Sequence, residues 1–371
     1  MKILCLSYEY PPVGGGGAKV VSNILNGLMG KAHEATLVTM HFRGLPFNER
    51  RGGLRILRVP CIRLKKEICY AIEMIPYLLV ALPCLCASLL KNKYDVNHTH
   101  FIFPDGLLAL VVKLLFGIPY IITAHGSDVP GYNPDRFSLL HKLLLPLWRL
   151  VAENAESIVC PSMFLENLVK VNSPRAKTDI IPNGIDVQRM RATQPRSKRI
   201  LVVTRMFERK GVQHLLSALV GLETDYEVVI VGDGPYLPTL KEIARREGAN
   251  VIFTGFLENN GAQLLNLYEE SSIFVFTSSA ENFPIVLLEA MLAGLAIITS
   301  NTTGCVEVVG NTALTVTPGD VQGIKNALVR LTDDDDYRAE LGKRARARVE
   351  NNFSNGAVVT MYESIFQRVI Q

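Results

Sequence analysis

The chain has 371 residues, a formal net charge of +4 and a hydrophobic content of 48%. This length is enough for two domains of ordinary size, each with its own core. The small net charge excludes a protein that binds bulk polyanions such as nucleic acid through its overall charge. The high apolar content favours a buried parallel sheet, and it is also compatible with contact with a membrane.

The seven cysteines are scattered, odd in number and include no Cys-x-x-Cys pair. This pattern predicts a reduced, cytoplasmic protein without a disulfide framework or a zinc site. The first apolar run, residues 2–7, is too short for a signal peptide and leads directly into Pro11 and Pro12. We therefore expect no secretory leader.

Both halves of the chain alternate short apolar runs with helical stretches, which predicts parallel sheets covered on both faces. In the first half, strands are expected at residues 2–7, 35–40, 54–59, 96–100, 120–124, 157–161 and 179–181, and helices at residues 18–29, 68–91, 106–116 and 138–153. In the second half, strands are expected at residues 199–204, 227–231, 251–254, 273–277, 296–299 and 313–316, and helices at residues 212–220, 236–247, 262–270, 284–293 and 321–331. The predicted fold class is α/β, with two Rossmann-like, doubly wound domains in tandem and a ligand-binding cleft between them.

A polar stretch at residues 186–198 follows the turn signal Pro-Asn-Gly and marks the predicted domain border. It separates an N-terminal domain, residues 1–186, from a C-terminal domain, residues 187–355. The final helix, residues 356–371, is predicted to join the N-terminal domain.

A glycine loop follows the first strand and precedes a helix, so its backbone N–H groups are placed to approach an anion. It is not a P-loop, because no Ser or Thr follows Lys19. It is not a dinucleotide fingerprint either, because an acidic residue about twenty positions on is missing. The alternative is a simple tight turn.

Two cations, Arg205 and Lys210, lie between the first strand and the first helix of the second domain. Arginine binds phosphate oxygens in a fork and lysine acts as a point charge, so this loop suits a diphosphate. Because Arg209 adds a third positive charge, an anionic partner fits better than a solvated basic loop.

Two glutamates, Glu281 and Glu289, stand eight residues apart, the first in a loop after a strand and the second in the following helix. The carboxyl edge of a parallel sheet is where ligands bind, and two acceptor groups there suit the hydroxyls of a sugar or a ribose. The alternative is a helix with two solvated glutamates.

Together these motifs resemble those of the family 4 glycosyltransferases, which have the GT-B fold of two Rossmann-like domains. The matching pieces follow the order of the family over nearly the whole chain: PPVGGGGAKVV at 11–21, DVNHTH at 95–100, TAHGSDV at 123–129, IIPNGID at 180–186, VTRMFERKG at 203–211, VGDGP at 231–235, FTGF at 253–256, the glutamate pair, and TTGCVEVV at 302–309. The glutamate spacing combined with Arg205 and Lys210 upstream is the specific part of the resemblance.

The resemblance implies a retaining, hexosyltransferase-like enzyme that takes a sugar from a nucleotide-diphosphate sugar. Arg205 and Lys210 would hold the diphosphate and stabilise the charge that grows on the leaving group. Glu289 would accept hydrogen bonds from the ribose, and Glu281 would contact the donor sugar. No side-chain nucleophile is implied, because the leaving phosphate is thought to help deprotonate the acceptor. The other implied site residues are Gly15 and Gly16 near the phosphates, Phe256 and Leu257 beside the base, Asn282 and Phe283 facing the sugar hydroxyls, His125 near the reacting centre, and His100 and Asp128 on the acceptor side.

The sequence departs from the family pattern beside Phe283. In addition, its acidic run at 333–336 could suggest a metal site. Asn282 and Pro284 replace the glycines that often flank the position of Phe283, and proline has no N–H to offer a sugar hydroxyl. The acidic run at 333–336 is interpreted as a solvated loop that caps the next helix. We expect no cofactor and no catalytic metal.

Residues 74–90 form the most apolar stretch of the chain, and residues 43–66 before it carry eight cations against one acid, Glu49. About 20 apolar residues are needed to span a bilayer, and two prolines make a span unfavourable. A basic segment beside an apolar helix suits peripheral contact with an anionic membrane, on its cytoplasmic face, and hence a lipid-linked acceptor. The alternative is a buried helix with a solvated loop.

Three function classes follow. The first is a retaining glycosyltransferase that acts on a hydroxyl acceptor such as a lipid-linked or cell-surface glycan precursor. The second is a sugar-nucleotide epimerase or hydrolase with the same fold, which the glutamate pair disfavours. The third is a non-catalytic nucleotide-sugar-binding protein, which would be expected to lack Arg205, Lys210 or Glu289.

Overall fold

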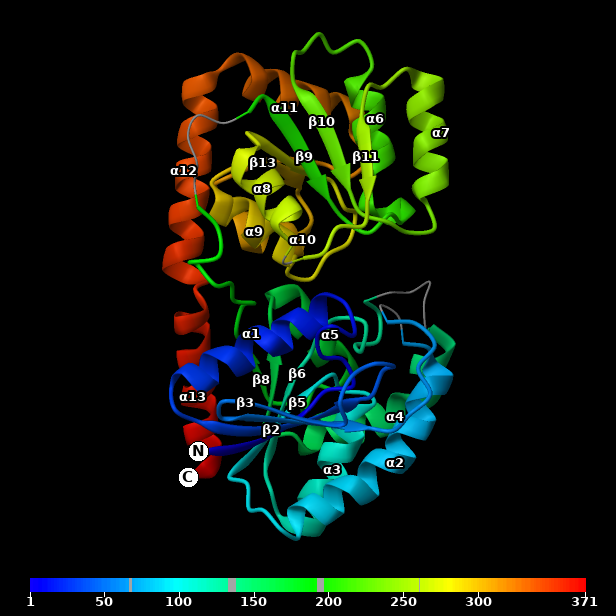
Figure 1. The fold of residues 1–371 in the computed structure, drawn as a ribbon, viewed down its shortest axis with the longest axis vertical. Coiled ribbons are helices and arrows are strands. Elements are labelled where there is room, and N and C mark those ends of the chain that lie inside the picture. The colour runs from blue at the N-terminus through cyan, green and yellow to red at the C-terminus, as the bar shows by residue number, and fades with distance from the viewer. Residues whose placement is uncertain (67–68, 133–137, 192–196, 260) are drawn as a thin grey trace. The chain divides into compact units, whose positions relative to one another are not determined.

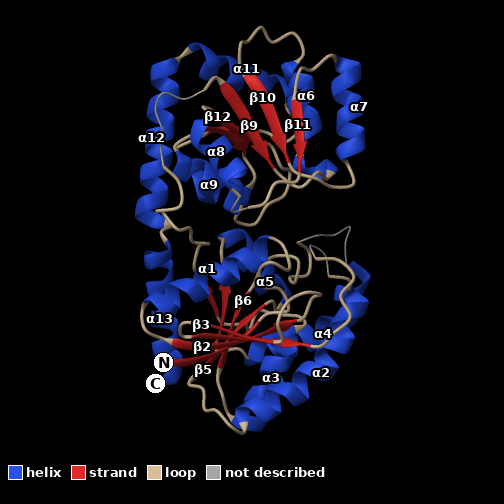
Figure 2. Cartoon of the chain, viewed as in Figure 1, coloured by secondary structure: helices blue, strands red, loops and turns tan. Residues whose placement is uncertain are grey.

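The computed structural model describes residues 1–66, 69–132, 138–191, 197–259 and 261–371, and part of the predicted linker, residues 192–196, lies outside this range. The chain divides into two compact units, each with its own sheet (Figures 1 and 2). Unit 1 comprises Met1–Gly184 and Asn355–Gln371, and unit 2 comprises Ile185–Ser354. This division lies two residues from the predicted border, and it places the last helix in unit 1.

The sheet of unit 1 has the strand order β3-β4-β2-β1-β5-β6-β7-β8. Its neighbours pair in parallel except β3 and β4, which form an antiparallel hairpin. Its strands are β1 (Lys2–Leu6), β2 (Glu34–Met40), β3 (Asn48–Arg51), β4 (Leu54–Val59), β5 (Val96–His100), β6 (Tyr120–Thr123), β7 (Ser157–Cys160) and β8 (Thr178–Ile180). The order changes direction at β1, which lies between β2 and β5. Ligands bind outside the carboxyl ends of the strands at such a switch point.

Helices cover both faces of this sheet (Figure 1). On one face α1 (Gly16–Gly30) packs against α13 (Asn355–Ile370), and on the other α2 (Ala71–Leu89), α3 (Asp105–Phe116) and α4 (Ser138–Asn154) lie next to one another. The helix α5 (Met163–Asn172) packs on β7 and β8. The α1–α13 contact is tight, because a Cβ at Gly27 would collide with Val359. This contact explains why the last helix belongs to unit 1.

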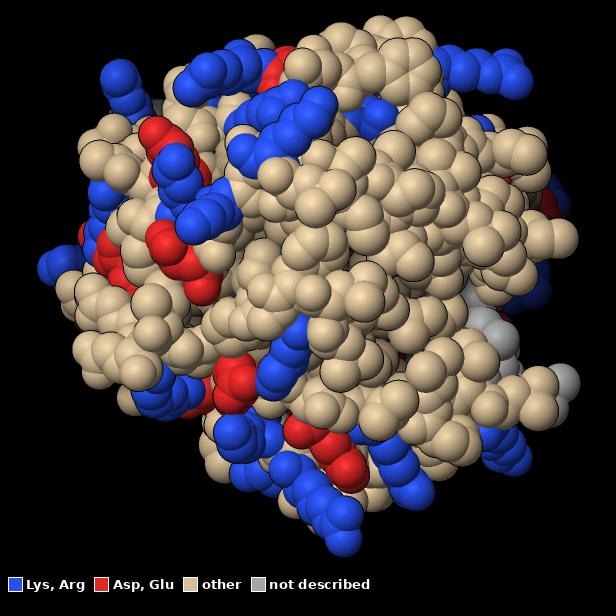
Figure 3. All heavy atoms as spheres, turned by 90° about the horizontal axis from the view of Figure 1, so that it is seen from below, with Lys and Arg blue, Asp and Glu red and all other residues tan. Residues whose placement is uncertain are grey.

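The helix α2 is apolar on both of its faces. Its inner face buries Tyr77, whose hydroxyl donates a 2.7 Å hydrogen bond to Asp105 Oδ1. Its outer face exposes Ile72, Ile75 and Leu79, with exposed fractions of 75%, 59% and 71%. Among the described helices, α2 is the one long and apolar enough to cross a membrane by length and composition. Figure 3, a view from below, shows a broad area without charged side chains, with Lys and Arg gathered along its borders.

The sheet of unit 2 is parallel, with the order β11-β10-β9-β12-β13-β14. Its strands are β9 (Arg199–Val203), β10 (Glu227–Val231), β11 (Ile252–Gly255), β12 (Ile273–Phe276), β13 (Ala296–Ser300) and β14 (Leu314–Val316). The chain builds outward from β9 to β11, returns to place β12 beside β9, and then builds outward on the other side. This is the strand order of a dinucleotide-binding fold, with its switch point between β9 and β12.

Two cores cover the two faces of this sheet, because successive strand residues point to opposite sides. In β9, Ile200 and Val202 join the core with α6 (Val212–Leu219), α7 (Leu237–Glu247) and α11 (Val321–Asp333). Leu201 and Val203 join the core with α8 (Ala262–Glu270), α9 (Ile285–Ala293), α10 (Thr303–Val309) and α12 (Asp335–Asn352). The predicted doubly wound architecture is confirmed for each unit.

Apolar periodicity missed β3, α5, α10 and α12. The helix α12 is polar on most of its surface, and its buried residues form one narrow stripe, Leu341, Gly342, Ala345 and Val349. Its start was nevertheless indicated by the acidic run, because Asp334 caps α12 by accepting a 2.9 Å hydrogen bond from the Tyr337 N–H. The capping role predicted for that run is confirmed.

Candidate functional site

The predicted cations and glutamates of unit 2 gather where β9 and β12 end. Arg205 and Lys210 follow β9, Glu281 follows β12, and Glu289 lies in α9. Since β9 and β12 are parallel neighbours, their carboxyl ends meet at one edge of the sheet, at the switch point. The sequence alone placed each residue after its strand, and the strand order now places the strand ends together.

The loop that carries Arg205 is held by the glycines of the VGDGP motif. The Met206 N–H donates a 2.9 Å hydrogen bond to the Asp233 carbonyl, and the Tyr236 N–H donates one of 3.0 Å to the Met206 carbonyl. Gly234 adopts a φ of +157°, and a Cβ there would lie 2.9 Å from the Met206 nitrogen. Only glycine permits this approach. Arg205 itself is exposed, with its guanidinium 5.2 Å from the centre of the Phe207 ring.

Lys210 and Glu281 form an ion pair between the two strand-end loops, and each side chain is largely buried. Neighbouring contacts fix both loops: the Ser279 N–H donates to the Arg209 carbonyl at 2.8 Å, and the Thr277 hydroxyl donates to the Gly211 carbonyl at 3.2 Å. A lysine ammonium has three N–H donors, so its bond to Glu281 leaves capacity for an anion. The pair therefore places the positive charge of Lys210 beside the Glu281 carboxylate, which can accept hydrogen bonds from sugar hydroxyls.

Glu289 is 3% exposed, and other side chains bond both of its carboxylate oxygens. Arg189 Nη1 bonds its Oε1 at 2.7 Å, and the Tyr268 hydroxyl donates to its Oε2 at 3.2 Å. Burial, and then the charge of Glu289, raises the pKa of Tyr268 well above its usual range, so this phenol stays a donor. The carboxylate predicted to bind ribose is therefore held in one orientation.

The other predicted donor-binding residues of unit 2 lie on the same strand-end loops. Asn282 and Phe283 are buried directly after Glu281, and the Phe283 ring meets Phe353 edge-on at 5.4 Å. Phe256 and Leu257 follow β11, with Phe256 62% exposed. A large exposed aromatic ring at a strand end is available to stack on a base.

A hollow of about 250 Å³ opens beside this edge, lined in part by Arg209, Gly211, Thr277 and Ser279. Among the described residues that line it, the predicted Arg205, Lys210 and the two glutamates do not appear. Its lining includes Arg209 and Gly211, the two chain neighbours of Lys210.

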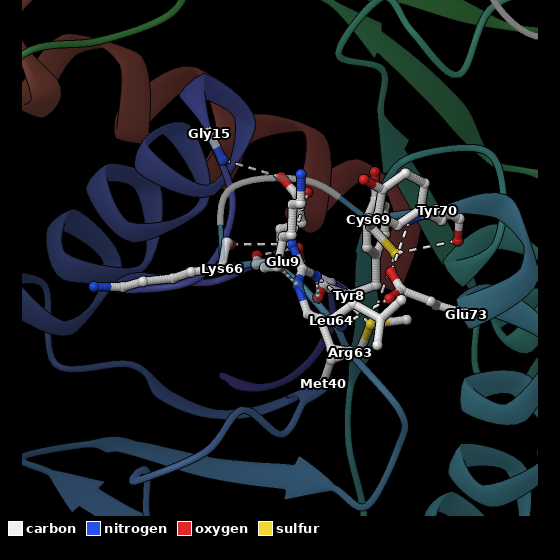
Figure 4. A network of polar contacts seen from close by, with 12 residues as sticks. Tyr8, Glu9, Gly15, Met40, Arg63, Leu64, Lys66, Cys69, Tyr70 and Glu73 are labelled. Carbon is white, nitrogen blue, oxygen red and sulfur yellow. Dashed lines mark hydrogen bonds and ion pairs between the residues drawn. The ribbon is translucent and has the colours of Figure 1, made fainter. Parts of the chain in front are cut away.

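In unit 1 the switch point at β1 carries the glycine loop, and a buried ion pair supports that loop (Figure 4). The Gly15 N–H donates to Glu9 Oε2 at 3.3 Å, and Arg63 bonds Glu9 Oε1 at 3.3 Å. The Gly14 N–H donates to the Lys66 carbonyl at 2.8 Å. One of the two glycine amides predicted near phosphate is thus engaged by a carboxylate, while Gly16 begins α1.

Two of the eight cations assigned to a surface segment are in fact buried and paired, Arg58 with Glu49 and Arg63 with Glu9. The basic surface before α2 is correspondingly smaller than the sequence indicated. The exposed cations next to the helix are Lys65 and Lys66.

Three histidines lie close together in unit 1, two in β5 and one just after β6. His100 Nδ1 and His125 Nε2 are 3.2 Å apart, and the ring of His98 lies 4.3 Å from that of His100. Burial, and then the neighbouring His125, lowers the pKa of His98 to about 3, and burial lowers those of His100 and His125. His100 is fully buried behind His125, which does not suit direct contact with an acceptor. His125 keeps some exposed surface.

Asp128, also predicted on the acceptor side, is a buried structural residue. Its two carboxylate oxygens accept hydrogen bonds from the N–H groups of Ile102, at 2.8 Å, and His125, at 3.0 Å. Its own carbonyl accepts from Trp148 at 2.8 Å. Asp128 therefore fixes the loop that presents His125.

Within the described residues no group of three or more His, Cys, Asp or Glu side chains is arranged to hold a metal ion. The seven cysteines are all unpaired. Sequence reasoning missed Arg189, Glu9 and Arg63, whose partners lie far from them along the chain.

Two family models match most of the chain. Residues 14–189 match the model of Glycosyltransferase Family 4, and residues 187–348 match that of Glycosyl transferases group 1. The chain is 28% identical to N-acetyl-alpha-D-glucosaminyl L-malate synthase of Bacillus anthracis, over 98% of this chain and 96% of that one. It is 26% identical to glycogen synthase of Mycobacterium tuberculosis, over 99% and 94%.

Solved structures show the same fold. Sucrose-phosphate synthase of Thermosynechococcus elongatus aligns with a TM-score of 0.85 at 21% identity, covering 99% of this chain and 98% of that one. The Anabaena protein HepE in complex with UDP aligns with a TM-score of 0.78 at 18% identity, covering 99% and 100%.

Two α/β units built on largely parallel sheets, together with matches to two glycosyltransferase family models, define a GT-B glycosyltransferase. The two family models together span residues 14–348, and the chain belongs to the family 4 glycosyltransferases.

Proposed function

We propose that unit 2 binds a nucleoside-diphosphate sugar with its diphosphate on Arg205 and Lys210, its ribose on Glu289 and its sugar beside Glu281. The Lys210–Glu281 ion pair at the switch point carries this proposal, because it joins a cation and an acceptor where the strand ends meet. HepE was solved with UDP and UDP-glucose, and starch synthase IV of Arabidopsis thaliana with ADP, which supports a nucleoside-diphosphate donor of this kind.

The proposed role of the cations follows from the negative charge that develops on the leaving diphosphate. As the bond between sugar and phosphate breaks, negative charge grows on the diphosphate, and preorganised cations stabilise that charge more than they stabilise the ground state. Phe256 and Leu257 would flank the base, and the loop at Asn282 and Phe283 would face the sugar. No side chain is assigned as nucleophile, and the configuration at the sugar is retained.

In unit 1 we assign the reacting-centre role to His125, with Gly15 and Gly16 toward the phosphates. His100 and Asp128 act through His125, one on its ring and the other on its backbone. His125 is neutral near pH 7 because burial lowers its pKa, so it would contribute hydrogen bonds and not a positive charge.

The experiment is a thermal-shift and calorimetric titration with UDP, ADP and GDP. One of them should stabilise the protein, since ligand binding shifts unfolding by mass action. Lys210→Ala should weaken that binding by about tenfold or more, the scale of a lost charge-assisted hydrogen bond. Lys241→Ala, an exposed cation on α7, is the matched control and should bind normally. Binding that is equal in the two variants would reject the assignment.

The acceptor is proposed to be a glycan or lipid-linked hydroxyl at an anionic membrane, with the enzyme bound peripherally on the cytoplasmic face. The exposed face of α2, together with Ile62 and Leu64, offers apolar side chains beside Lys65 and Lys66. Such a surface suits the interface of an anionic bilayer, where each basic residue adds about 1 kcal/mol. The buried Tyr77 favours a helix that lies on the membrane over one that crosses it.

Co-sedimentation with vesicles tests this contact. The protein should pellet with phosphatidylglycerol vesicles at low salt and much less with phosphatidylcholine vesicles or at high salt. Ile75→Ser combined with Leu79→Ser should reduce pelleting. Val171→Ser, an equally exposed apolar residue on α5, should not. Pelleting that ignores lipid charge and the α2 substitutions would reject the contact.

A further inference from the structure

Arg189 stands at the centre of a set of contacts that the sequence did not reveal. It follows the border between the units, and its guanidinium bonds Glu289 Oε1 through Nη1 at 2.7 Å. Through Nη2 it also bonds the Asn259 carbonyl, in the segment that follows β11. One planar side chain thus links the helix α9 to the loop that begins with Phe256 and Leu257.

We propose that Arg189 is a positioning residue for nucleotide recognition, which holds the Glu289 carboxylate in the orientation that accepts the ribose hydroxyls. This inference rests on the proposed function and adds to it the residue that makes Glu289 effective.

Burial supplies the first reason. Glu289 is 3% exposed, and a buried carboxylate is costly unless it is paired and hydrogen-bonded. Arg189 is the cation that contacts it, and the Arg189 side chain is itself only 14% exposed. Removing one partner of such a pair leaves the other charge uncompensated, which disturbs it far more than a surface pair would.

Geometry supplies the second reason. Arg189 contacts one carboxylate oxygen and Tyr268 the other, so the plane of the Glu289 carboxylate is fixed from two sides. A carboxylate offers about four acceptor positions over its two oxygens, and Arg189 and Tyr268 each approach a different oxygen. A vicinal diol needs two acceptor directions that do not rotate, and a fixed carboxylate provides them.

The link to Asn259 supplies the third reason. If the loop after β11 borders the base, Arg189 fixes the ribose-binding carboxylate relative to the base-binding loop. The spacing between ribose and base is constant in every nucleotide, so a rigid link of this kind favours a nucleotide over a bare diphosphate.

The test compares each nucleotide with its form that lacks ribose hydroxyls. The tightest binder among UDP, ADP and GDP is titrated against its 2′,3′-dideoxy form by calorimetry. For the wild-type protein the hydroxyls should contribute about 10- to 100-fold in Kd, the range for hydrogen bonds to a charged group. For Arg189→Met this ratio should fall below about threefold, as it should for Glu289→Gln, because both changes act through the same hydroxyls.

Three controls separate the alternatives. Arg189→Lys should restore part of the hydroxyl ratio, because it returns a positive charge beside Glu289. Arg191→Met, an exposed arginine two residues on, should leave the ratio unchanged. Unfolding curves of all variants would identify a folding defect, and a defect alone would weaken both ligands equally and leave their ratio intact.

The outcomes are distinct. A wild-type protein that binds none of the three diphosphates overturns the proposed function and this inference with it. A wild-type protein with a large hydroxyl ratio that Arg189→Met also keeps overturns the role of Arg189 alone. Loss of the ratio in Arg189→Met with partial return in Arg189→Lys supports it.

Discussion

The switch points of the two sheets carry different kinds of residue. In unit 2 the strand ends carry charged residues that are held in pairs, Lys210 with Glu281 and Arg189 with Glu289. In unit 1 the corresponding edge carries glycines and neutral, buried histidines, with one ion pair, Arg63 with Glu9, hidden beneath the loop. The same architecture therefore carries charged side chains at the switch point of unit 2 and mainly uncharged side chains at that of unit 1.

This difference indicates that unit 2, and not unit 1, carries the charged side chains suited to a diphosphate. A diphosphate needs cations near it, and the described edge of unit 2 carries the exposed Arg205 and the largely buried Lys210. In unit 1 the polar groups mainly satisfy one another: Asp128 holds backbone amides, and His100 supports His125. Substitutions in unit 2 should therefore affect donor chemistry, and those in unit 1 should affect stability first.

The largest expected effect is a loss of kcat/KM when a cation of unit 2 is removed. Arg205→Met should lower kcat/KM with the best nucleotide sugar by about 100- to 1000-fold, because each preorganised group at a growing charge contributes about that much. Arg246→Met, on the exposed face of α7, should stay near wild type. Steady-state kinetics would measure both, and a loss below tenfold for Arg205→Met would contradict the charged role of this edge.

In unit 1 the glycine loop should show a stability effect. Gly14 has a φ of +102°, and a Cβ there would lie 2.6 Å from Glu9 Oε2. Gly14→Ala should cost about 3 kcal/mol of unfolding free energy, from left-handed strain and from overpacking. Chemical denaturation measures it. An unchanged midpoint would show that the Glu9 support is not rigid.

The buried histidines should make unit 1 sensitive to acid. His98 has a pKa lowered to about 3 in the folded protein, while an unfolded histidine titrates near 6.5, so the unfolded chain binds the extra proton below that pH. Stability is therefore complete above about pH 6.5 and is lost as the pH falls toward 3.

Removing this histidine should reduce that loss. Between pH 7 and pH 5, His98 alone should cost about 2 kcal/mol, so His98→Gln should lose about that much less than wild type over the same range. Denaturation at the two pH values gives the difference. Equal losses in the two proteins would mean that His98 is protonated in the folded state.

The smallest expected effect on stability is that of a substitution at Gly15, which should instead change ligand binding. Gly15 has open space where a Cβ would lie, so Gly15→Ala should change the unfolding free energy by less than about 0.5 kcal/mol. If an anion approaches this amide, the same change should weaken nucleotide-sugar binding several-fold. Binding as tight as wild type would remove Gly15 from the site.

Much of the fold could be predicted from the sequence, because short apolar runs separated by helices have few arrangements other than parallel sheets. The predicted residues of unit 2 could be placed at strand ends for the same reason. Arg189 could not be found, because a residue 100 positions before Glu289 gives no local sign of the contact. Arg63 was assigned to a surface segment but is buried. Its ion-pair partner, Glu9, is 54 positions away, so the sequence gives no local sign of the pairing.

The most direct test of the central claim is a crystal structure of the protein with the nucleoside diphosphate that binds it best. We expect phosphate oxygens within hydrogen-bond distance of Arg205 and Lys210, and ribose hydroxyls on the Glu289 carboxylate. A nucleotide whose phosphates contact other cations, or whose ribose lies away from α9, would contradict it.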